Sequence, residues 1–400
     1  MYLKELKIKN FRNIESQNIE LNKNVNIFIG NNAQGKTSIL ESIYVLALSK
    51  SSKNVDENNL IKMNSDFSKI FGVIQTTSSK KNLEIVLTKN QKILRINKNE
   101  IRKISEYISN LNIIMFSPDD LDIVKKSPSI RRSLINTTLC QLYPNYLRIL
   151  SEYNKLLKIR NEYLKKDIST IDKLYFEILT DKLIDRALII MEYRDKFIND
   201  INLNINNIYY KIMKEKGLKV SYIKSIDINT KEDLKKVFKD SFREEFHKKM
   251  TFIGPHRDDI SFMLDDVDLK LYGSQGQQRT SILAFKLSEI DLFKKILGFY
   301  PVVLLDDIFS ELDIEKRNNL LKFIKSNIQF IITTTDIKNI SSKIIDKAKV
   351  FVVEKGKIKE GAVYGKQWKI RTLWFFGYSS FRRIRSSKKK TWNVYRNNWC

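Results

Sequence analysis

The sequence predicts an α/β fold in which a mixed sheet with flanking helices is interrupted by an inserted helical domain. A glycine-rich loop at 30–37 lies between a short apolar stretch at 25–29 and a stretch with helical periodicity at 38–48. A second apolar strand signal, at 301–305, ends in two aspartates. Between these two features, residues 129–216 have the periodicity of helices. Strand and helix signals on both sides of a helical block indicate one α/β core that is divided in the sequence.

The bulk composition is that of a globular protein. The chain has 400 residues, 42% of them hydrophobic, which is enough for two or three domains. No stretch approaches the ~18 apolar residues of a membrane span, and the first residues run directly into strand-like sequence without a signal peptide. Cys140 and Cys400 have neither metal-binding spacing nor a paired framework. We therefore expect a reduced, cytoplasmic protein.

The net charge of +26 favours a nucleic-acid partner. The alternative explanation is compositional, because Lys, Asn and Ile dominate the whole chain as an AT-rich genome would produce. Ten of the basic residues and none of the acidic ones lie in 361–400, which leaves +16 on the rest of the chain. We expect DNA or RNA as the partner, although charge alone does not decide this.

The loop 30–37 fits the phosphate-binding pattern G-x-x-x-x-G-K-[ST]. Its flanking strand and helix would place backbone N–H groups and a helix N-terminus around a phosphate anion. Lys36 would reach the β and γ phosphates of ATP, and the hydroxyl of Thr37 would hold Mg²⁺. A chance match is disfavoured because both flanks have the required character. The nucleotide-binding residues expected in this loop are Gly30, Asn31, Asn32, Ala33, Gln34, Gly35, Lys36 and Thr37.

Asp306 and Asp307 follow the apolar strand signal at 301–305. Asp306 would organise Mg²⁺ together with Thr37, and Asp307 would lie near the γ-phosphate and polarise water. Two acids after an apolar run are often only a strand end that meets solvent, but a phosphate loop requires such a partner. We expect Lys36, Asp306 and Asp307 as catalytic residues, with Thr37 and Asp306 as the metal ligands.

A second loop suited to anions opens the helical stretch 277–297. Ser274, Gly276 and Gln277 lie at the expected N-terminus of this helix. One triphosphate does not need two such loops within a subunit, so we expect this loop to close over ATP held by another copy of the chain. A glycine turn with a serine helix cap is the structural alternative. The position of the loop, some thirty residues before the acidic strand, favours the functional interpretation.

These three elements together resemble the head of ABC-type ATPases, with 274–278 as the signature loop and 310–313 as the loop after the acidic strand. The resemblance is closer still to the RecF family and covers about residues 1–360, in the same order. The matching stretches are Phe11-Arg12-Asn13, Asn32-Ala33-Gln34-Gly35-Lys36-Thr37, Phe116-Ser117-Pro118-Asp119-Asp120-Leu121, Ser127-Pro128-Ser129-Ile130-Arg131-Arg132, Gly254-Pro255-His256-Arg257-Asp258-Asp259, Leu305-Asp306-Asp307 and Thr333-Thr334-Thr335-Asp336.

Two departures from the wider ABC pattern imply slow hydrolysis suited to timing. An aspartate, Asp307, stands where a glutamate is usual, and Thr334-Thr335-Asp336 contains no switch histidine. The glutamine of the family's glutamine loop is not identified: Gln75 is one candidate, and the turn after Phe116 is the other candidate place. For His247 and His256 we expect a surface position and a turn hydrogen bond, respectively.

The order of strand and helix signals predicts four segments: an ATPase lobe with the phosphate loop at 1–125, a helical insertion domain at 126–250, an ATPase lobe with the signature loop and acidic strand at 251–360, and a basic, Trp-rich tail at 361–400 that has no counterpart in the RecF pattern. All four tryptophans of the chain lie in that tail. A nucleic-acid-binding tail is one interpretation. We favour the other, read-through or frameshifted sequence, because the tail has no periodicity and follows the last clear strand signal, at 350–353.

By this resemblance the chain is expected to bind ATP and Mg²⁺, to dimerise on ATP, and to clamp single-stranded or gapped DNA in recombinational repair and replication-fork maintenance. It would be a weak DNA-dependent ATPase that helps load RecA, is required for SOS induction, and has RecR and RecO as partners. A structural chromosome ATPase of the SMC type is the alternative, disfavoured because 129–216 is too short for a long arm. A transporter ATPase subunit is disfavoured by the charge and by the RecF-like stretches.

Overall fold

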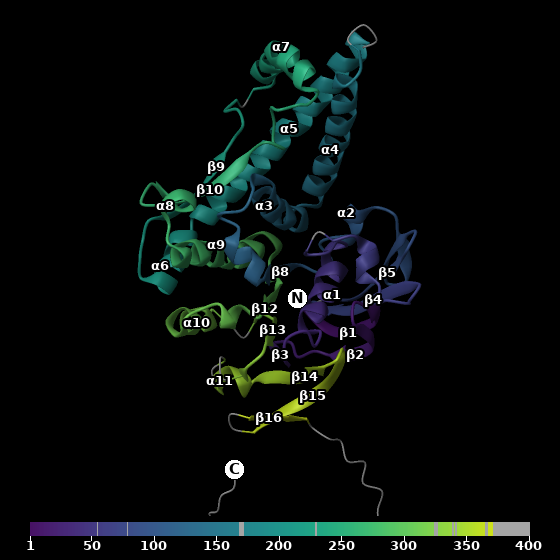
Figure 1. The fold of residues 1–400 in the computed structure, drawn as a ribbon, viewed down its shortest axis with the longest axis vertical. Helices are drawn as coiled ribbons and strands as arrows, with labels where there is room; N and C mark the ends of the chain where they lie inside the picture. Colours follow the sequence, from purple (N-terminus) through teal and green to yellow (C-terminus); the bar gives the residue numbers. More distant parts are fainter. Residues whose placement is uncertain are drawn as a thin grey trace, which may run out of the picture.

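The computed structural model describes residues 1–53, 55–77, 79–167, 172–228, 230–323, 327–337, 340, 342–364 and 367–370. The described chain forms two large sheets with helices, from which a helical arm projects (Figure 1). None of its helices is long and apolar enough to cross a membrane. The expected α/β class with a helical insertion is confirmed.

The first sheet is antiparallel throughout, and its strand order is β2-β1-β4-β5-β6-β7. Its strands are β1 (Tyr2–Phe11), β2 (Ile14–Glu20), β4 (Phe67–Gln75), β5 (Lys80–Thr88), β6 (Lys92–Ile96) and β7 (Asn99–Ile101). Buried residues alternate with more accessible ones along most of β1 and β5, because one face packs on the core while the other faces solvent.

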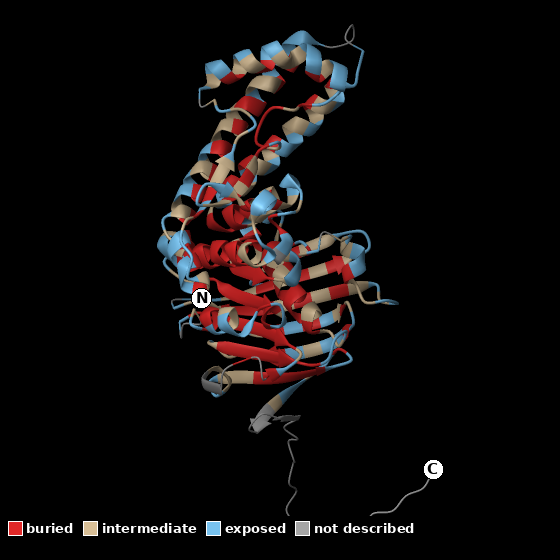
Figure 2. Ribbon diagram, turned by 60° about the vertical axis from the view of Figure 1, so that its left-hand side comes forward, coloured by how far each residue is buried: buried red, intermediate tan, exposed pale blue. Residues whose placement is uncertain are grey.

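The second sheet is mixed and has the order β16-β15-β14-β3-β13-β12-β8. Its strands are β3 (Val25–Ile29), β8 (Ile113–Phe116), β12 (Val302–Asp306), β13 (Phe330–Thr334), β14 (Ala348–Glu354), β15 (Lys357–Tyr364) and β16 (Gln367–Ile370). The five strands from β14 to β8 are parallel, and β15 and β16 add antiparallel pairs at one edge. Strands β3, β12 and β13 are buried at every residue, as expected where both faces of a parallel sheet are covered (Figure 2).

Helix α1 (Lys36–Leu48) lies between the two sheets. Its apolar residues share one core with the inner face of the first sheet and with Phe28 and Leu304 of the second. The opposite face of the second sheet, which includes Ile27, packs in the other core with α9 (Gln275–Leu297), whose middle section is almost wholly buried. The phosphate loop therefore follows the end of a central strand, β3, in a sheet that is packed on both faces.

The described part of the predicted insertion contains five helices, and β9 (Leu218–Ile223) lies between the last two of them. The helices are α3 (Pro128–Leu142), α4 (Pro144–Leu164), α5 (Lys173–Asn202), α6 (Ile205–Met213) and α7 (Lys231–Lys248). At 1.5 Å per residue, the 21-residue α4 and the 30-residue α5 are about 32 and 45 Å long, so the arm is short, as predicted. The remaining elements are short: α2 (Ile104–Tyr107), α8 (Leu269–Tyr272), α10 (Ile314–Leu321), α11 (Ser342–Ile345), and the 3-10 helices η1 (Glu57–Leu60), η2 (Pro118–Asp122) and η4 (Ile308–Ser310).

The strand predicted near 260–264 does not join either of the two large sheets. It is β10 (Asp259–Leu264), which pairs with β9 (Leu218–Ile223) and β11 (Val267–Asp268) in a sheet of its own. In addition, Arg131 of α3 forms two hydrogen bonds of 2.7 Å to the carboxylate of Asp259. β10 therefore belongs to a sheet with β9 and β11 and not to either of the two large sheets.

The prediction that the strand at 350–353 is the last one is wrong. β15 follows it, and Gly361 of β15 pairs with both Val350 of β14 and Ile370 of β16. The sheet therefore crosses the predicted tail boundary at 361. The sequence did not indicate these two strands, because charged residues interrupt the apolar ones in β15 and β16 has only 4 residues. Residues 371–400, with Trp374, Trp392 and Trp399, lie outside the described residues.

Candidate ATP-binding site

The loop after β3 has two positions where only glycine fits. A Cβ on Gly30 would lie 2.3 Å from the carbonyl oxygen of Val353. Gly35 has φ +107°, and its Cβ would lie 2.8 Å from the side chain of Asn13. The loop is therefore held between the turn at Asn13 and the strand β14, and its backbone follows a path that side chains would block.

Gln34 fastens the outer side of this loop. Its side-chain oxygen accepts a hydrogen bond of 2.7 Å from the N–H of Lys355, and its carbonyl accepts one of 2.9 Å from the N–H of Gly356. Both donors belong to the turn between β14 and β15. The side chain of Gln34 thus holds the loop in place from the side of the hairpin.

Lys36 is curled across its own loop. Its Nζ donates to the carbonyl oxygens of Gly30 at 2.8 Å and Asn31 at 2.9 Å, and the residue is 6% exposed. Burial lowers the pKa of Lys36, and the nearby carboxylates of Asp307 and Asp306 partly oppose that shift. An ammonium group satisfied only by carbonyl oxygens is well suited to exchange one of them for a phosphate oxygen.

Thr37 and Asp306 meet although 269 residues separate them in the sequence. The hydroxyl of Thr37 donates to Oδ1 of Asp306 at 3.1 Å, and the hydroxyl of Thr333 donates to the same oxygen at 2.8 Å. Burial raises the pKa of Asp306, while the hydrogen bonds from Thr333 and Thr37 act in the opposite direction. A hydroxyl and a carboxylate side by side have the chemistry that would hold Mg²⁺, with phosphates and waters as its other ligands. The residues present fit Mg²⁺, and no larger group of metal-binding side chains is found in the described part of the chain.

Asp307 has an unusual conformation and an unmatched oxygen. Its φ is +50°, in the left-handed region that non-glycine residues rarely adopt. Its Oδ1 is buried and has no hydrogen-bond partner, and burial raises its pKa against the effect of Lys36. Strain and an unpaired buried oxygen are the features of a group held ready for a ligand.

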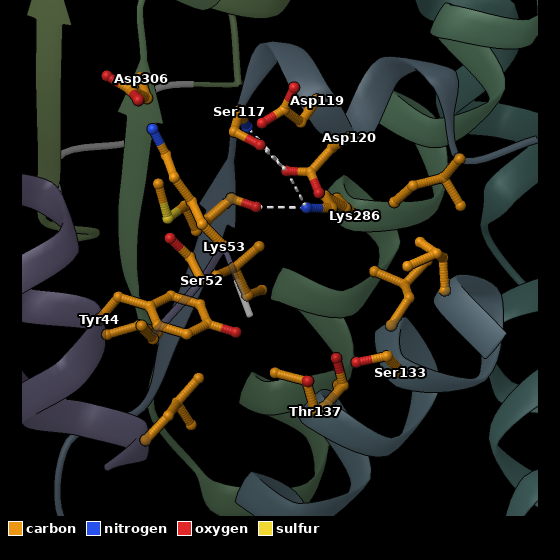
Figure 3. Close-up of a pocket in the computed structure, with 18 of the residues that line it drawn as sticks. Tyr44, Ser52, Lys53, Ser117, Asp119, Asp120, Ser133, Thr137, Lys286 and Asp306 are labelled. Carbon is orange, nitrogen blue, oxygen red and sulfur yellow. Dashed lines mark hydrogen bonds and ion pairs between the residues drawn. The ribbon is translucent and has the colours of Figure 1, made fainter. Parts of the chain in front are cut away.

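Thr333 was not among the predicted site residues, yet it supports both aspartates. Besides its bond to Asp306, it accepts a hydrogen bond of 3.0 Å from the N–H of Asp307. Lys53 was also missed, and Figure 3 shows its ammonium directed towards Asp306. The run of threonines at 333–335 was the available signal for Thr333. Only the parallel pairing of β12 with β13 places it beside Asp306.

The loop at Ser274 caps helix α9 with a reciprocal pair of bonds. The Ser274 hydroxyl accepts from the N–H of Gln277 at 3.2 Å, and the Gln277 side chain accepts from the N–H of Ser274 at 3.0 Å. Gln277 also donates to Glu215 at 3.2 Å. Ser274 is therefore a helix cap, as the alternative interpretation of this loop predicted. Because Ser274 is also exposed, the cap does not prevent this loop from contacting ATP bound to another copy of the chain.

Two clefts adjoin the pair Thr37 and Asp306. The smaller, of about 190 Å³, contains the phosphate loop, Asn13 and Asp307. The larger, of about 610 Å³, extends along α1 to Ser117, Asp120 and α9 (Figure 3). The structure brings the phosphate loop and the acidic pair together, whereas Ser274, Gly276 and Gln277 line neither cleft.

Gln75 lies away from this site, at the end of β4, where its amide donates to the carbonyl oxygens of Thr76 and Ser79. Ser117, the other candidate position, lines the larger cleft. His256 is held between the hydroxyl of Tyr153 at 2.6 Å and the carbonyl of Thr251 at 3.0 Å, while His247 is exposed on α7. These positions agree with the expected surface position of His247 and the expected hydrogen bond of His256 in a turn.

Because of Glu289 in α9, the free energy of unfolding should depend on pH. It accepts a hydrogen bond of 2.5 Å from Thr138, and burial raises its pKa to about 7. Between pH ~4.5 and ~7 the folded state keeps a proton that the unfolded state has lost, so stability falls as the pH rises, by at most ~1.4 kcal/mol per pH unit. We expect Glu289→Gln to remove this loss, so its free energy of unfolding should increase relative to wild type from pH 5 to pH 7.

Urea unfolding at both pH values measures this effect, and Glu192→Gln, at an exposed glutamate of α5, is the control. The comparison must be with wild type at each pH, because His256 acts in the opposite direction. Burial lowers the pKa of His256 to about 4, so its contribution to stability is lost as the pH falls from ~6.5 to ~4. An unchanged difference between Glu289→Gln and wild type would contradict the prediction.

The two sheets, the phosphate loop between them and the acidic strand define the class of the protein as an ABC-type ATPase head. Residues 2–359 match the family model described as the RecF/RecN/SMC N terminal domain, and the chain belongs to this family. It is 39% identical to the DNA replication and repair protein RecF of Geobacillus sp. (strain WCH70), over 90% of this chain and 98% of that protein. It is 38% identical to the RecF of Ligilactobacillus salivarius (strain UCC118), with the same coverage.

Solved structures agree with this membership. The structure of the recombination mediator protein RecF with ATP in the RecFOR pathway superposes with a TM-score of 0.83 at 30% identity, covering 90% of this chain and 98% of that one. An Smc head bound to the C-winged helix domain of ScpA covers 90% of this chain and 97% of its own, with a TM-score of 0.51 and 16% identity. That second likeness shows the fold alone.

Proposed function

We propose that this protein is an ATP-dependent DNA clamp of recombinational repair, which binds ATP in the loop 30–37 and dimerises when ATP is bound. One observation carries the proposal. Lys36, Thr37, Asp306 and Asp307 converge on one cleft, while the anion loop at Ser274 lies elsewhere on the same chain. The relatives named RecF, one of them solved with ATP, support the same assignment.

In the proposed site, each residue has a distinct role. Lys36 would exchange its bonds to Gly30 and Asn31 for bonds to phosphate oxygens, and backbone N–H groups of the loop would hold the rest of the triphosphate. Thr37 and Asp306 would hold Mg²⁺, which supplies positive charge against the phosphates. Asp307 would accept a hydrogen bond from the attacking water. Ser274, Gly276 and Gln277 of a second copy would close the site from the other side.

ATP binding would favour the closed dimer, and hydrolysis would reopen it, as a shift between two populated states. Each subunit has a net charge of +26, so the closed dimer would gather the positive charge of two subunits around DNA. By family relationship, RecR and RecO are the expected partners, RecA loading and SOS induction the expected outcome, and the cytoplasm the expected location. For the domain limits, we propose that the insertion extends through β10 and β11.

A structural chromosome ATPase is the second candidate, and the short arm formed by α4 and α5 disfavours it. Sedimentation of the protein with and without ATP and gapped DNA should show a dimer on DNA only with ATP, at a salt-sensitive affinity. Dimerisation without nucleotide, or no binding to gapped DNA, would contradict the clamp.

Asp307→Asn should bind ATP and dimerise but hydrolyse ATP at least tenfold more slowly. The amide keeps the shape of the side chain and loses the charge that polarises water, while Asp306 and Thr37 remain. Phosphate release measures turnover, and the DNA-bound dimer should live longer. Asp240→Asn, at an exposed aspartate of α7 on the arm, is the control. Turnover at the wild-type rate would show that another group positions the water.

A further inference from the structure

A groove opens where three helices meet, away from the proposed nucleotide site. Helix α6 packs against both α9 and α10 (Figure 1). The groove between them has a volume of about 350 Å³, which is within the range of ~300–1,000 Å³ that is typical of ligand-binding clefts. It shares no lining residue with either cleft beside the phosphate loop, so a ligand bound here would not occupy the ATP site.

The floor of this groove is apolar. It is formed by buried residues of α6, α9 and the loop before β13, namely Ile208, Leu287, Ile290 and Ile328. The half-buried side chain of Phe323, which follows α10, lines the groove as well. Because apolar surface gains free energy when it is removed from water, this floor favours a ligand with apolar side chains to bury.

The rim of the groove is positively charged. Lys211 and Lys214 lie at the end of α6, and Lys322 follows α10. None of the three forms an ion pair with a described residue, and Lys322 only donates a hydrogen bond of 2.8 Å to the side-chain oxygen of Asn319. One acid, Asp291, is among the described lining residues, and it accepts a hydrogen bond of 3.0 Å from a neighbouring amide. Three lysines against one carboxylate complement a negatively charged ligand.

Three other occupants fit this groove poorly. The tail at 361–400 has ten basic residues and no acidic ones, and a second copy of the chain brings a net charge of +26, so like charges would meet at the rim. Nucleic acid would supply negative charge, but the floor is mainly aliphatic and lacks the aromatic faces on which bases stack. The occupant that matches both floor and rim is a polypeptide with apolar and acidic side chains.

We propose that this groove binds an acidic segment of another protein. The segment inserts apolar side chains between α6, α9 and α10, and its carboxylates lie beside Lys211, Lys214 and Lys322. An amphipathic helix is a suitable form for such a segment, because its apolar face can fill a groove while its acidic face meets the rim. The proposal does not depend on ATP-driven dimerisation.

A labelled peptide tests the role of the rim. The probe is a fluorescein-labelled amphipathic helix of about 15 residues, with leucines at helical spacing and glutamates elsewhere. Fluorescence anisotropy measures its affinity for the full-length protein without nucleotide. The variant Lys211→Gln with Lys214→Asn removes two rim charges, and asparagine suits the φ of +63° at position 214. We expect its affinity to fall at least about tenfold, because charge-assisted hydrogen bonds are lost.

The matched control is Lys236→Gln with Lys239→Gln. These lysines are exposed on α7, have the same spacing along a helix, and form no ion pair with a described residue. This variant loses the same amount of charge and should bind the peptide like wild type. If both variants lost affinity equally, the peptide would be held only by the general charge of the protein, and the proposal would be overturned.

Phe323→Ala tests the apolar part and remains informative if the lysine variant does not fold. It should weaken peptide binding at least about fivefold, because the leucines lose a surface that they cover. Phe71→Ala, at a half-buried phenylalanine of β4, is its control and should have no effect. A peptide with alanines in place of the leucines should bind wild type as weakly as the leucine peptide binds Phe323→Ala.

Four results would contradict the proposal. One is wild-type protein that does not bind the leucine peptide, and another is equal binding of the alanine peptide. Tighter peptide binding by protein that ends at residue 370 would mean that the tail occupies the groove. Loss of gapped-DNA binding or of ATP-dependent dimerisation in the lysine variant, with peptide binding unchanged, would assign the groove to DNA or to a second copy. Failure of ATP-driven dimerisation in wild type would leave this inference untouched.

Discussion

Lys36→Ala is expected to reduce ATP affinity by at least about a hundredfold, without unfolding the protein. The ammonium of Lys36 is the buried cation of the phosphate loop, and it is satisfied in the structure only by two loop carbonyl oxygens. Hydrogen bonds from a charged donor to a charged acceptor are about twice as strong as neutral ones, and alanine removes all of them. Titration with a fluorescent ATP analogue measures the loss, which ATP-stimulated DNA binding should follow.

A matched control for this variant is Lys92→Ala. Lys92 of β6 is also partly buried and also donates to a backbone carbonyl, that of Ser49 at 2.8 Å, which lies at the far end of α1 from the phosphate loop. Its loss should leave ATP affinity unchanged. If Lys36→Ala bound ATP like wild type, the loop 30–37 would not be the nucleotide site, and the assignment would be wrong.

Ser274→Arg is expected to abolish ATP-dependent dimerisation while the monomer still binds ATP. Ser274 is exposed and caps α9, and it lines neither cleft next to the phosphate loop, so a bulky cation there would block only what approaches from outside. Analytical ultracentrifugation with ATP should show a monomer. Loss of the cap alone costs about 1 kcal/mol of stability, which a thermal melt detects separately.

Thr230→Arg provides the control for the cap, because Thr230 also caps a helix with its hydroxyl, α7, but on the arm. It should lose comparable stability and still dimerise. Mixing Ser274→Arg with Lys36→Ala protein should restore one competent composite site per heterodimer. Loss of ATP binding by monomeric Ser274→Arg would mean that the loop acts within its own chain, contrary to the dimer model.

The phosphate loop could be predicted because its evidence is local. The motif 30–37 needs a strand before it and a helix after it, and all three are neighbours in the sequence. The structure has β3 and α1 at these places, and Gly30 and Gly35 are constrained by the close approach of Val353 and Asn13. Asp306 and Asp307 were predictable for a related reason, because a fully apolar strand ending in acids is a signal within a few residues.

Contacts that depend on strand order could not be predicted. Thr333 supports both aspartates only because β13 is the parallel neighbour of β12. Lys286 meets Asp120 across 166 residues of sequence because β8 is the edge strand next to β12 and α9 packs behind it. Neither Thr333 nor Lys286 belongs to a sequence motif from which its partner could have been predicted.

The strands β10 and β15 show the same division between local pattern and long-range pairing. Residues 259–264 have the alternation of a strand, but alternation does not say whether the partner is the ATPase sheet or β9. β15 has only weak strand character and is held by its hydrogen bonds to β14. Short-range patterns therefore predicted most of the strands and helices and the candidate residues for phosphate and metal. Only the tertiary structure decided which elements are neighbours, because backbone pairing and packing select partners by shape and burial over hundreds of residues, and these are properties of the assembled core.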